Sequence, residues 1–500
     1  MRRPERKRKS RVLRTAAGIG AGLMVLAGLA GCSQKEKDYD VYFFNAKSEI
    51  AEALEQAAAS YEAETGKRVK TFTVGTTESQ ETLRSELKSK AYPTIFAANA
   101  VQFEEWKSAG YALGEEDIRN PELKALYESI PEPMRLQFDG EGNFGIPYNM
   151  EGYGVIADTR VIAEMLGLAD TKTFESDYCE ASYEEFQAMI QAMDAYIKGE
   201  GGESFRLNGN TYQTQTEKGA LTASLNGVFS IAGAEKWTYG NHFGNYPICA
   251  VYSDVYEVKG AEPEQAELLK EPVRKSLEEL EFLTRFAAGA DGPVERGPRF
   301  INSTVTGYDQ AVQNFAQGKA VFIKNGNWIY GNVEKISPEK AENLTMLPMK
   351  LNLTDADIQV EGLTVEQMNR SIPEFVSQYY VVNSKCTEKE QEEAEAFLLW
   401  LNTSETGMDY IVNQFAFVPF QAEEGTVLDN SLSNALVRFK AAGNILSNPF
   451  DAAPSAWGTE MYGRYLMEEL FIQPETWDGA RLEEIAGECV EYWKSGMEEW

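Results

Sequence analysis

The sequence predicts an α/β protein that begins with a parallel sheet and continues with a second α/β region. Apolar runs alternate with segments of helical periodicity between residues 41 and 97, in the order β-α-β-α-β. A second α/β pattern starts after residue 148. Strands that are joined by helices run parallel, with right-handed crossovers. The length of 500 residues gives room for about three domain-sized units or two large lobes.

The first block opens with an apolar strand at residues 41–44. Residues 50–61 carry apolar side chains at helical spacing, and Gly66 supplies a stop signal for this helix. A second strand is predicted at residues 69–74, a short helix around Leu83 and Leu87, and a third strand at residues 94–96. Open parallel sheets bind ligands beyond the carboxyl ends of their strands. We therefore expect ligand contacts in the loops at residues 45–47, 75–80 and 97–102.

The second block has equally clear local signals. A strand is predicted at residues 154–157, and a helix begins at Ser182, which has capping-box spacing with Glu185, and ends at Gly199. Further along, we expect a helix at residues 308–317, a strand at 320–323 and a capped helix after Thr387. The apolar stripe between Leu482 and Trp493 predicts a final helix.

The composition excludes several classes of function. The chain has 47 basic and 78 acidic residues, a net charge of −31 and a pI near 4.6, and without residues 1–31 the net charge is −38. Such an acidic surface repels phosphate backbones and anionic lipids, so we expect no nucleic-acid partner. The only histidine, His242, excludes a multi-histidine zinc site, and the sequence favours a structural or surface role for it.

The N-terminus has the pattern of a secretion signal. Eight basic residues precede an uncharged run at residues 16–31, which is short for a membrane span. The run ends in the segment L-A-G-C, with Cys32 at the position that would become the new N-terminus. This segment resembles a bacterial lipobox. We expect residues 1–31 to be removed, Cys32 to be lipidated, and residues 32–39 to form a tether that holds the protein on the outer face of a membrane.

Signatures of enzymes and of metal sites are mostly missing from the sequence. It holds no G-x-S-x-G elbow and no complete P-loop, and the cysteine spacing matches no metal motif. We therefore expect no catalytic residues, no metal and no cofactor. A disulfide between Cys179 and Cys249 stays open at this point, as does a pair of catalytic carboxylates.

Four segments, in order along the chain, resemble those of the family 1 extracellular solute-binding proteins, the maltose-type lipoproteins that feed ABC transporters. F-A-Q-G-K-A-V-F at residues 315–322, followed by N-G-N-W at 325–328, resembles the family's F-x-x-G-K-A and N-G-x-W. Y-P-T-I-F at residues 92–96 resembles x-P-D-I-F, but with Thr94 where Asp is usual. G-I-P at residues 145–147 and T-S-E-T-G at 403–407 resemble two further motifs, the second with one residue changed.

This resemblance implies a two-lobed clamp of the periplasmic-binding-protein type (type II). Each lobe would be a mixed α/β sheet flanked by helices, and a multi-strand hinge would join the two. The N-terminal lobe would comprise residues 40–149 and about 373–430, and the C-terminal lobe residues 150–372 and about 431–500. The ligand would bind in the cleft by hinge closure.

The ligand-binding residues follow from strand ends and from positions that the resemblance implies. By resemblance, Trp328 and Trp457 occupy the positions of sugar-stacking tryptophans. Tyr148 and Glu151 flank the crossover between the lobes, where hinge packing is the alternative role. The full set of candidates consists of Asn45, Lys47, Gln80, Asn99, Gln102, Tyr148, Glu151, Trp237, Asn327, Trp328 and Trp457.

The expected function is capture of a carbohydrate, in particular an oligosaccharide, by a lipid-anchored, extracytoplasmic and monomeric protein that delivers it to the permease subunits of an ABC importer. Aromatic faces cover the C–H faces of a pyranose, and polar side chains hydrogen-bond its hydroxyls. One alternative is a binding protein for a non-sugar solute such as a polyamine or a peptide. Another is a surface glycoside hydrolase.

Overall fold

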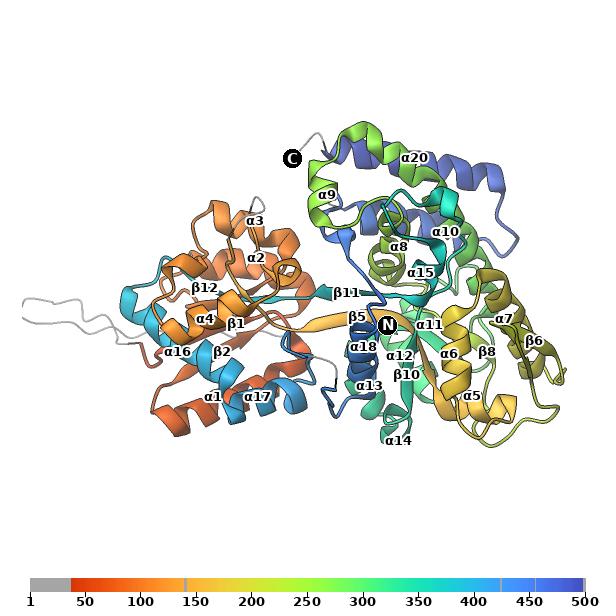
Figure 1. Cartoon of the computed structure of the whole chain (residues 1–500), viewed down its shortest axis with the longest axis horizontal. Coiled ribbons are helices and arrows are strands. Elements are labelled where there is room, and N and C mark those ends of the chain that lie inside the picture. Colours follow the sequence, from red (N-terminus) through yellow and green to blue (C-terminus); the bar gives the residue numbers. More distant parts are fainter. Residues whose placement is uncertain (1–36, 139–141, 423–424, 455, 498–500) are drawn as a thin grey trace, which may run out of the picture. The chain divides into compact units, whose positions relative to one another are not determined.

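A computed structural model describes residues 37–138, 142–422, 425–454 and 456–497 (Figure 1). The predicted β-α-β-α-β block is confirmed. It consists of β1 (Val41–Asn45), α1 (Ala51–Thr65), β2 (Val69–Thr73), α2 (Thr76–Leu87) and β3 (Ile95–Ala98). Strand β1 pairs in parallel with both β2 and β3. Gly66 ends α1 in the left-handed conformation with φ of 73°, which a glycine adopts without strain.

The loops at these strand ends are shorter than expected. Residues 76–80 already form the first turns of α2, and residue 102 lies in α3 (Ala100–Ser108). The prediction of extended loops at residues 75–80 and 97–102 is therefore wrong. The helices begin directly after the strands. The sequence does not distinguish the two cases, because polar residues that suit a loop also suit the first turn of a helix.

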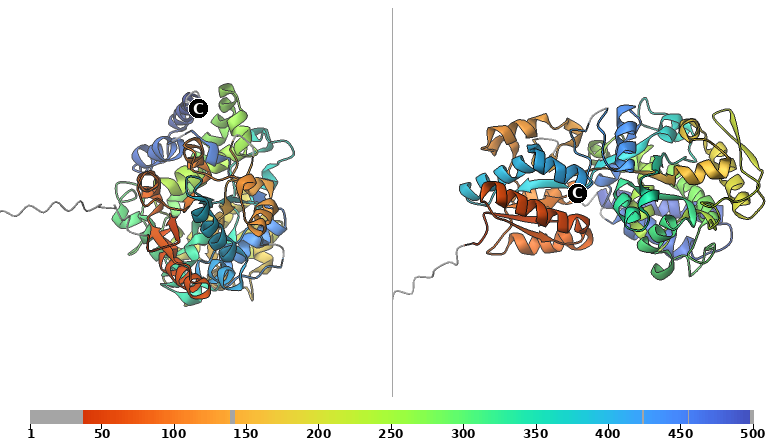
Figure 2. Two further views of the ribbon diagram at one scale, coloured as in Figure 1. Left: turned by 90° about the vertical axis from the view of Figure 1, so that its left-hand side faces the viewer. Right: turned by 90° about the horizontal axis from the view of Figure 1, so that it is seen from below.

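The first sheet has the strand order β2-β1-β3-β12-β4. Strands β12 (Tyr379–Val382) and β4 (Ile146–Pro147) join it antiparallel, so the sheet is mixed. Helices α1 and α16 (Glu388–Thr403) pack against it (Figure 2). Phe43 of β1 meets Phe397 of α16 in its core. Thr387 and Glu390 form the predicted capping box of α16. We call this part the N-terminal lobe.

The second sheet, which forms the C-terminal lobe, has the order β13-β11-β5-β9-β8, with β10 also paired to β5. Its strands are β5 (Met150–Asp158), β8 (Gly227–Ser230), β9 (Ala320–Gly326), β10 (Leu344–Leu347), β11 (Ile372–Val376) and β13 (Ile445–Leu446). The helices predicted there are present as α7 (Tyr183–Ile197), with its capping box at Ser182, α12 (Tyr308–Ala316) and α20 (Gly479–Met497). Helix α20 packs along α10 (Lys270–Leu283).

The remaining elements are smaller. They are the hairpin β6 (Ser204–Leu207) and β7 (Asn210–Gln213), and the helices α4 (Pro121–Ser129), α5 (Thr159–Leu166), α6 (Lys172–Glu180), α8 (Asn245–Cys249), α9 (Val255–Gly260), α11 (Ser303–Thr306), α13 (Tyr330–Glu334), α14 (Pro338–Ala341), α15 (Val365–Arg370), α17 (Glu405–Asp409), α18 (Ser431–Ala441) and α19 (Gly463–Tyr465). Within the described ranges, no helix is long and apolar enough to cross a membrane. Cys179 and Cys249 are both free thiols, so the disulfide left open by the sequence is not formed.

The chain passes between the two sheets next to two paired strands. It leaves β4 and enters β5 at residues 148–149, and it leaves β11 and enters β12 at residues 377–378. Strands β5 and β11 lie side by side (Figure 1). They are antiparallel, with Glu151 opposite Phe375. A third segment contacts the same place. The Val418 carbonyl accepts a hydrogen bond from the Met150 amide at 3.0 Å. The predicted multi-strand hinge is thus present.

Trp457 illustrates how the core of the C-terminal lobe is built. Its side chain is 1 % exposed, its indole stacks on Tyr462, and its N–H donates to the carbonyl of Cys489 in α20 at 3.0 Å. Trp457→Phe should lower the free energy of unfolding by about 1–3 kcal/mol, because it removes this hydrogen bond and leaves a void. Urea unfolding followed by circular dichroism measures the loss. An unchanged midpoint would contradict this placement of Trp457.

Candidate functional site

Five polar side chains meet where the chain first crosses between the sheets. We call them the hinge polar cluster: Asn45, Lys47, Tyr148, Asn149 and Glu151. Lys47 Nζ lies 2.5 Å from Glu151 Oε1, and Asn149 Nδ2 donates to the same oxygen at 2.8 Å. Tyr148 donates its hydroxyl hydrogen to Asn45 Oδ1 at 2.8 Å. The side chains of Lys47 and Glu151 are only 9 % and 7 % exposed, so the ion pair is largely removed from water.

The cluster ties three distant segments together. Asn45 is the last residue of β1. Its side-chain amide donates to the Lys47 carbonyl at 2.8 Å and to Thr73 Oγ1 at 3.1 Å. Asn149 Oδ1 accepts from the Val418 amide at 3.0 Å. Buried polar groups are stable only when they are hydrogen-bonded. The cluster therefore fixes the loop after β1 to the start of β5.

A row of partly exposed aromatic rings continues from the cluster. We call it the aromatic strip, and its members are Tyr308, Trp237, His242, Trp328 and Phe375. Neighbouring ring centroids lie 5.4 Å apart for Tyr308 and Trp237, 5.2 Å for Trp237 and His242, and 5.1 Å for His242 and Trp328. Phe375 lies 6.4 Å from Trp328. The strip thus exposes ring surface along a length of several side chains.

The strip rests on one face of the hinge strands. Side chains two residues apart on a strand share a face, and so do directly opposed residues on paired strands. Glu151 and Tyr153 of β5 therefore share a face with Phe375 of β11, and Gly326 of β9 lies opposite Tyr153. A Cβ at Gly326 would lie 1.9 Å from the Trp328 ring, so only glycine lets this indole lie over the strand.

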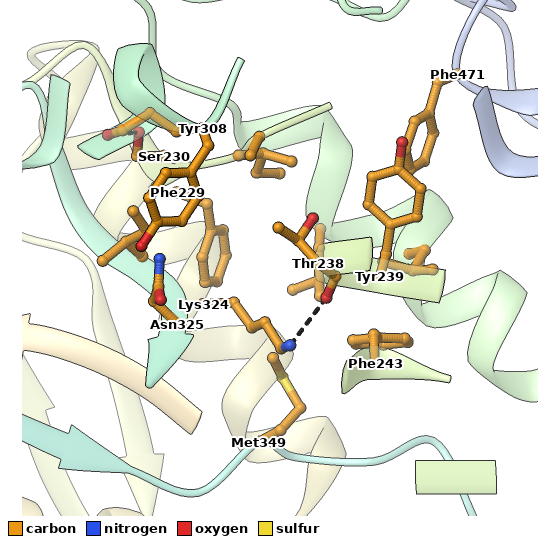
Figure 3. Close-up of a pocket in the computed structure, with 16 residues that line it drawn as sticks. Phe229, Ser230, Thr238, Tyr239, Phe243, Tyr308, Lys324, Asn325, Met349 and Phe471 are labelled. Atoms are coloured by element: carbon orange, nitrogen blue, oxygen red, sulfur yellow. Dashed lines mark hydrogen bonds between the residues drawn. The ribbon is translucent and has the colours of Figure 1, made fainter. Parts of the chain in front are cut away.

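Beside the strip lies a small cavity of about 60 Å³, lined mainly by apolar side chains (Figure 3). Tyr308 and Lys324 belong to its wall. Lys324 points toward Thr238 and donates to its carbonyl at 2.9 Å, and its Nζ also lies 4.7 Å from the centre of the Tyr153 ring. Burial holds the pKa of Lys324 well below its usual value of 10.5.

Two further titratable groups near the strip are also held toward their neutral forms. Burial, and secondarily the charge of Lys324, lowers the pKa of His242 well below 6.5. Burial raises the pKa of Asp451 to about 6. The Asp451 carboxylate is close enough to Tyr153 and Tyr379 for its charge to raise the pKa of both phenols, after the larger effect of their burial. The surroundings of the strip therefore disfavour isolated charges.

The structure brings together some of the residues predicted from the sequence. Lys47, Tyr148 and Glu151 meet in the hinge polar cluster, and Trp237 and Trp328 belong to the aromatic strip. Their contact with a ligand stays a prediction. The Tyr148 side chain is 1 % exposed and packs on Tyr380 with centroids 4.1 Å apart, which matches the hinge-packing alternative.

Three predicted residues lie apart from this group. Gln80 in α2 donates to Glu105 at 3.1 Å, and Glu105 is also paired with Arg84. Asn99 is partly exposed and follows β3 directly. Gln102 is in α3, and its side chain, like Cys32, lies outside what the structure describes.

Three further predicted residues are buried side chains, and their contact with a ligand stays a prediction. Trp457 is buried in the core, and its indole N–H donates to the backbone carbonyl of Cys489 in α20. Asn327 is 2 % exposed and uses its amide on the backbone of β5, accepting from the Gly152 amide at 3.1 Å. Asn45 is fully buried and its amide supports the loop to Lys47. Asn45 and Asn327 support the backbone beside the site, whereas Trp457 packs on Tyr462 and bonds α20 in the core of the C-terminal lobe.

Sequence reasoning missed Asn149 of the hinge polar cluster and Tyr308, His242 and Phe375 of the aromatic strip, together with Tyr153 and Lys324, which lie against the strip. His242 lies just beyond the polar-aromatic segment at residues 237–241, which already contained Trp237. No sequence signal marks the pairing of β5 with β11, on which the position of Phe375 depends.

Comparison with known proteins agrees with this architecture. The family described as bacterial extracellular solute-binding protein matches residues 56–426. No curated protein matches the chain. The chain therefore belongs to the bacterial extracellular solute-binding proteins, and it has the two-lobed fold of that class.

Solved structures share the fold at low sequence identity. The RafE solute-binding protein in complex with raffinose has a TM-score of 0.62 at 15 % identity, covering 91 % of this chain and 99 % of that chain. The GacH receptor of Streptomyces glaucescens, solved without ligand and with acarbose, has a TM-score of 0.60 at 12 % identity, with 92 % and 98 % covered. A chitin oligosaccharide binding protein has a TM-score of 0.60 at 15 % identity, with 91 % and 99 % covered.

The buried ion pair of the hinge polar cluster can be tested by a double-mutant cycle. Lys47→Met alone or Glu151→Met alone should lower the free energy of unfolding by about 3–5 kcal/mol, because each leaves a charge buried without its partner. The double variant should recover most of this loss. As a control, Lys198→Met breaks an exposed pair with Asp194 and should change stability by less than about 0.5 kcal/mol. Additive single effects would contradict the coupling.

The depressed pKa of Lys324 predicts a dependence of stability on pH. Unfolded Lys324 keeps its proton up to pH 10.5, whereas the folded side chain loses it well below that value. The unfolded state thus binds more protons in this window, and stability should rise with pH by up to about 1.4 kcal/mol per unit. Lys324→Met should flatten the rise between pH 7 and 10 in urea unfolding, whereas Lys198→Met should not. Parallel profiles for wild type and Lys324→Met would contradict the burial argument.

Proposed function

We propose that this protein is the substrate-binding subunit of an ABC importer and captures a carbohydrate, in particular an oligosaccharide, on the aromatic strip. The observation that carries the proposal is the strip itself, a run of partly exposed rings that continues directly from the hinge polar cluster. Exposed aromatic rings that are adjacent to each other mark binding surfaces more often than isolated ones do.

The chemistry of the strip suits a sugar. The rings of Trp237, Trp328 and Phe375 offer apolar faces to the C–H groups of pyranose rings, and these rings are large enough to carry much of the binding energy. The similar proteins bind raffinose, acarbose and a chitin oligosaccharide, and this supports a carbohydrate for this chain as well.

The acids near the strip argue against a polyamine. A polycation needs carboxylates that are ionised and unpaired. Glu151 already pairs with Lys47, so this carboxylate is not available to a polycation. A peptide remains the alternative that the binding assay below must separate from a sugar.

A hydrolase is also a weaker candidate, because Glu151 is already paired with Lys47. Glycoside hydrolysis needs two carboxyl groups that flank the bond to be cleaved, one of them ionised. Glu151 is held by Lys47 and Asn149, so it is committed to the hinge. We propose that the protein binds its ligand without covalent chemistry.

The proposed location follows from the sequence of the N-terminus. Lipidation of Cys32 after removal of residues 1–31 would hold the binding lobes on the extracytoplasmic face of the membrane, close to the permease subunits. The lobe boundaries near residues 149, 372 and 430 and the monomeric state belong to the same proposal.

Trp328→Ala tests the ligand site. If Trp328 stacks on a sugar, its loss should weaken binding at least tenfold, because a buried stacking ring contributes about 2 kcal/mol or more. A thermal-shift screen with raffinose, acarbose, chitin and xylan oligosaccharides, peptides and polyamines identifies the ligand, and calorimetry then measures its affinity.

Trp400→Ala is the matched control, since Trp400 is also partly exposed but lies in α16 against Tyr61. It should leave the affinity unchanged. A response to peptides alone, or equal affinity of Trp328→Ala and wild type for the sugar, would overturn the carbohydrate proposal.

A further inference from the structure

His242 occupies the middle of the aromatic strip. It lies in the π-helical segment Thr238–Phe243, and its ring stacks on Tyr153 with centroids 4.6 Å apart and planes inclined by 16°. Trp237, Trp328 and Phe375 surround it, at centroid distances of 5.2, 5.1 and 6.0 Å. The imidazole is partly exposed, so it contributes to the surface that the strip presents.

The ring nitrogens of His242 have no hydrogen-bond partner among the described residues. The contacts of its side chain with them are ring contacts, and none of their polar groups donates to or accepts from the imidazole. The ring is partly exposed, and neither nitrogen belongs to the buried side-chain atoms that lack a partner, so a ligand can reach them. Phenylalanine would pack on Tyr153 equally well but would offer no hydrogen-bonding group. The imidazole therefore offers an unused donor and an unused acceptor at the centre of the proposed binding surface.

The charged neighbours favour the neutral ring. Lys324 of β9 acts on His242 from one side, whereas Glu151 of β5 is paired with Lys47, and Phe375 of β11 and Trp328 carry no charge. Burial and Lys324 together lower the pKa of His242 well below 6.5. A neutral imidazole has one N–H donor and one nitrogen acceptor, and the hydroxyl groups of a sugar supply the complementary acceptor and donor.

We propose that His242 is a specificity residue of this site, whose imidazole donates one hydrogen bond to, and accepts one from, neighbouring hydroxyls of the sugar that packs on the strip. This inference rests on the proposed carbohydrate function and adds to it a residue that distinguishes sugars by the positions of their hydroxyl groups. It also replaces the structural or surface role that the sequence favoured for the only histidine.

Calorimetry with His242→Phe tests the proposal, because phenylalanine keeps the ring and removes both nitrogens. The probes are raffinose, acarbose, and chitin and xylan oligosaccharides. For a sugar that wild type binds, His242→Phe should bind about tenfold more weakly or worse, which corresponds to the loss of two hydrogen bonds. Tyr246→Phe is the control, since it removes a buried hydroxyl beside Tyr153 and should leave the affinity unchanged.

The outcomes separate this inference from the proposed function. If Trp328→Ala loses affinity while His242→Phe binds like wild type, the carbohydrate function stands and the role of His242 is wrong. If wild type binds none of the four sugars, the carbohydrate function fails and this inference fails with it.

Nuclear magnetic resonance gives a readout that packing alone would not change. With ¹⁵N-labelled histidine and a purification tag free of histidine, the protein shows the imidazole of His242 alone. The two nitrogen resonances should have the pattern of a neutral ring at pH 6, and saturating sugar should move the unprotonated nitrogen toward the value of a hydrogen-bond acceptor. Nitrogen resonances that stay in place at saturation would overturn the proposal.

Discussion

The register between β5 and β11 is the constraint on which the site depends. Because side chains alternate along a strand, a shift of one residue would turn Glu151 and Tyr153 away from Phe375 and from the aromatic strip. All residues of β5 are buried, and on its other edge Tyr153 lies opposite Gly326 of β9. One strand thus positions the acid of the hinge polar cluster and the ring beneath the aromatic strip.

The hinge polar cluster explains how a polar crossover can lie inside the protein. Removing Lys47 and Glu151 from water costs free energy, and their attraction offsets that cost only if further hydrogen bonds complete the arrangement. Asn149 supplies one of these bonds to Glu151, and Asn149 in turn holds the Val418 amide. The segments that cross between the sheets are therefore coupled through side chains as well as through backbone pairing.

Much of the fold follows from local signals in the sequence, whereas the site follows only partly. Periodicity and capping residues predicted α7 and α16 because these signals act within a few residues of the helix start. Trp328 and Trp457 were candidates by their resemblance to family motifs, and Trp237 was a candidate as an aromatic residue in a polar segment. The Trp457 N–H donates to the carbonyl of Cys489, and a motif looks the same whether the N–H faces a ligand or a backbone carbonyl.

The missed residues share a physical reason. Phe375 and Tyr153 are ordinary strand residues until β11 pairs with β5, and His242 is unremarkable until its ring is stacked on Tyr153. These relations join segments that are far apart in the chain, and no local pattern of charge or hydrophobicity records them. A pairing between distant strands is a property of the whole sheet.

The electrostatics of the strip narrow the class of ligand further. Lys324 and His242 have pKa values lowered by burial, and Asp451 has a raised one, so three groups of either sign are shifted toward neutrality in one region. A charged ligand would lose its hydration in surroundings where burial disfavours charge. A neutral molecule with many hydroxyl groups loses less on desolvation and finds both aromatic faces and neutral hydrogen-bonding groups. The same burial that depresses the charge of Lys324 thus favours an uncharged polyhydroxylated ligand over an ionic one.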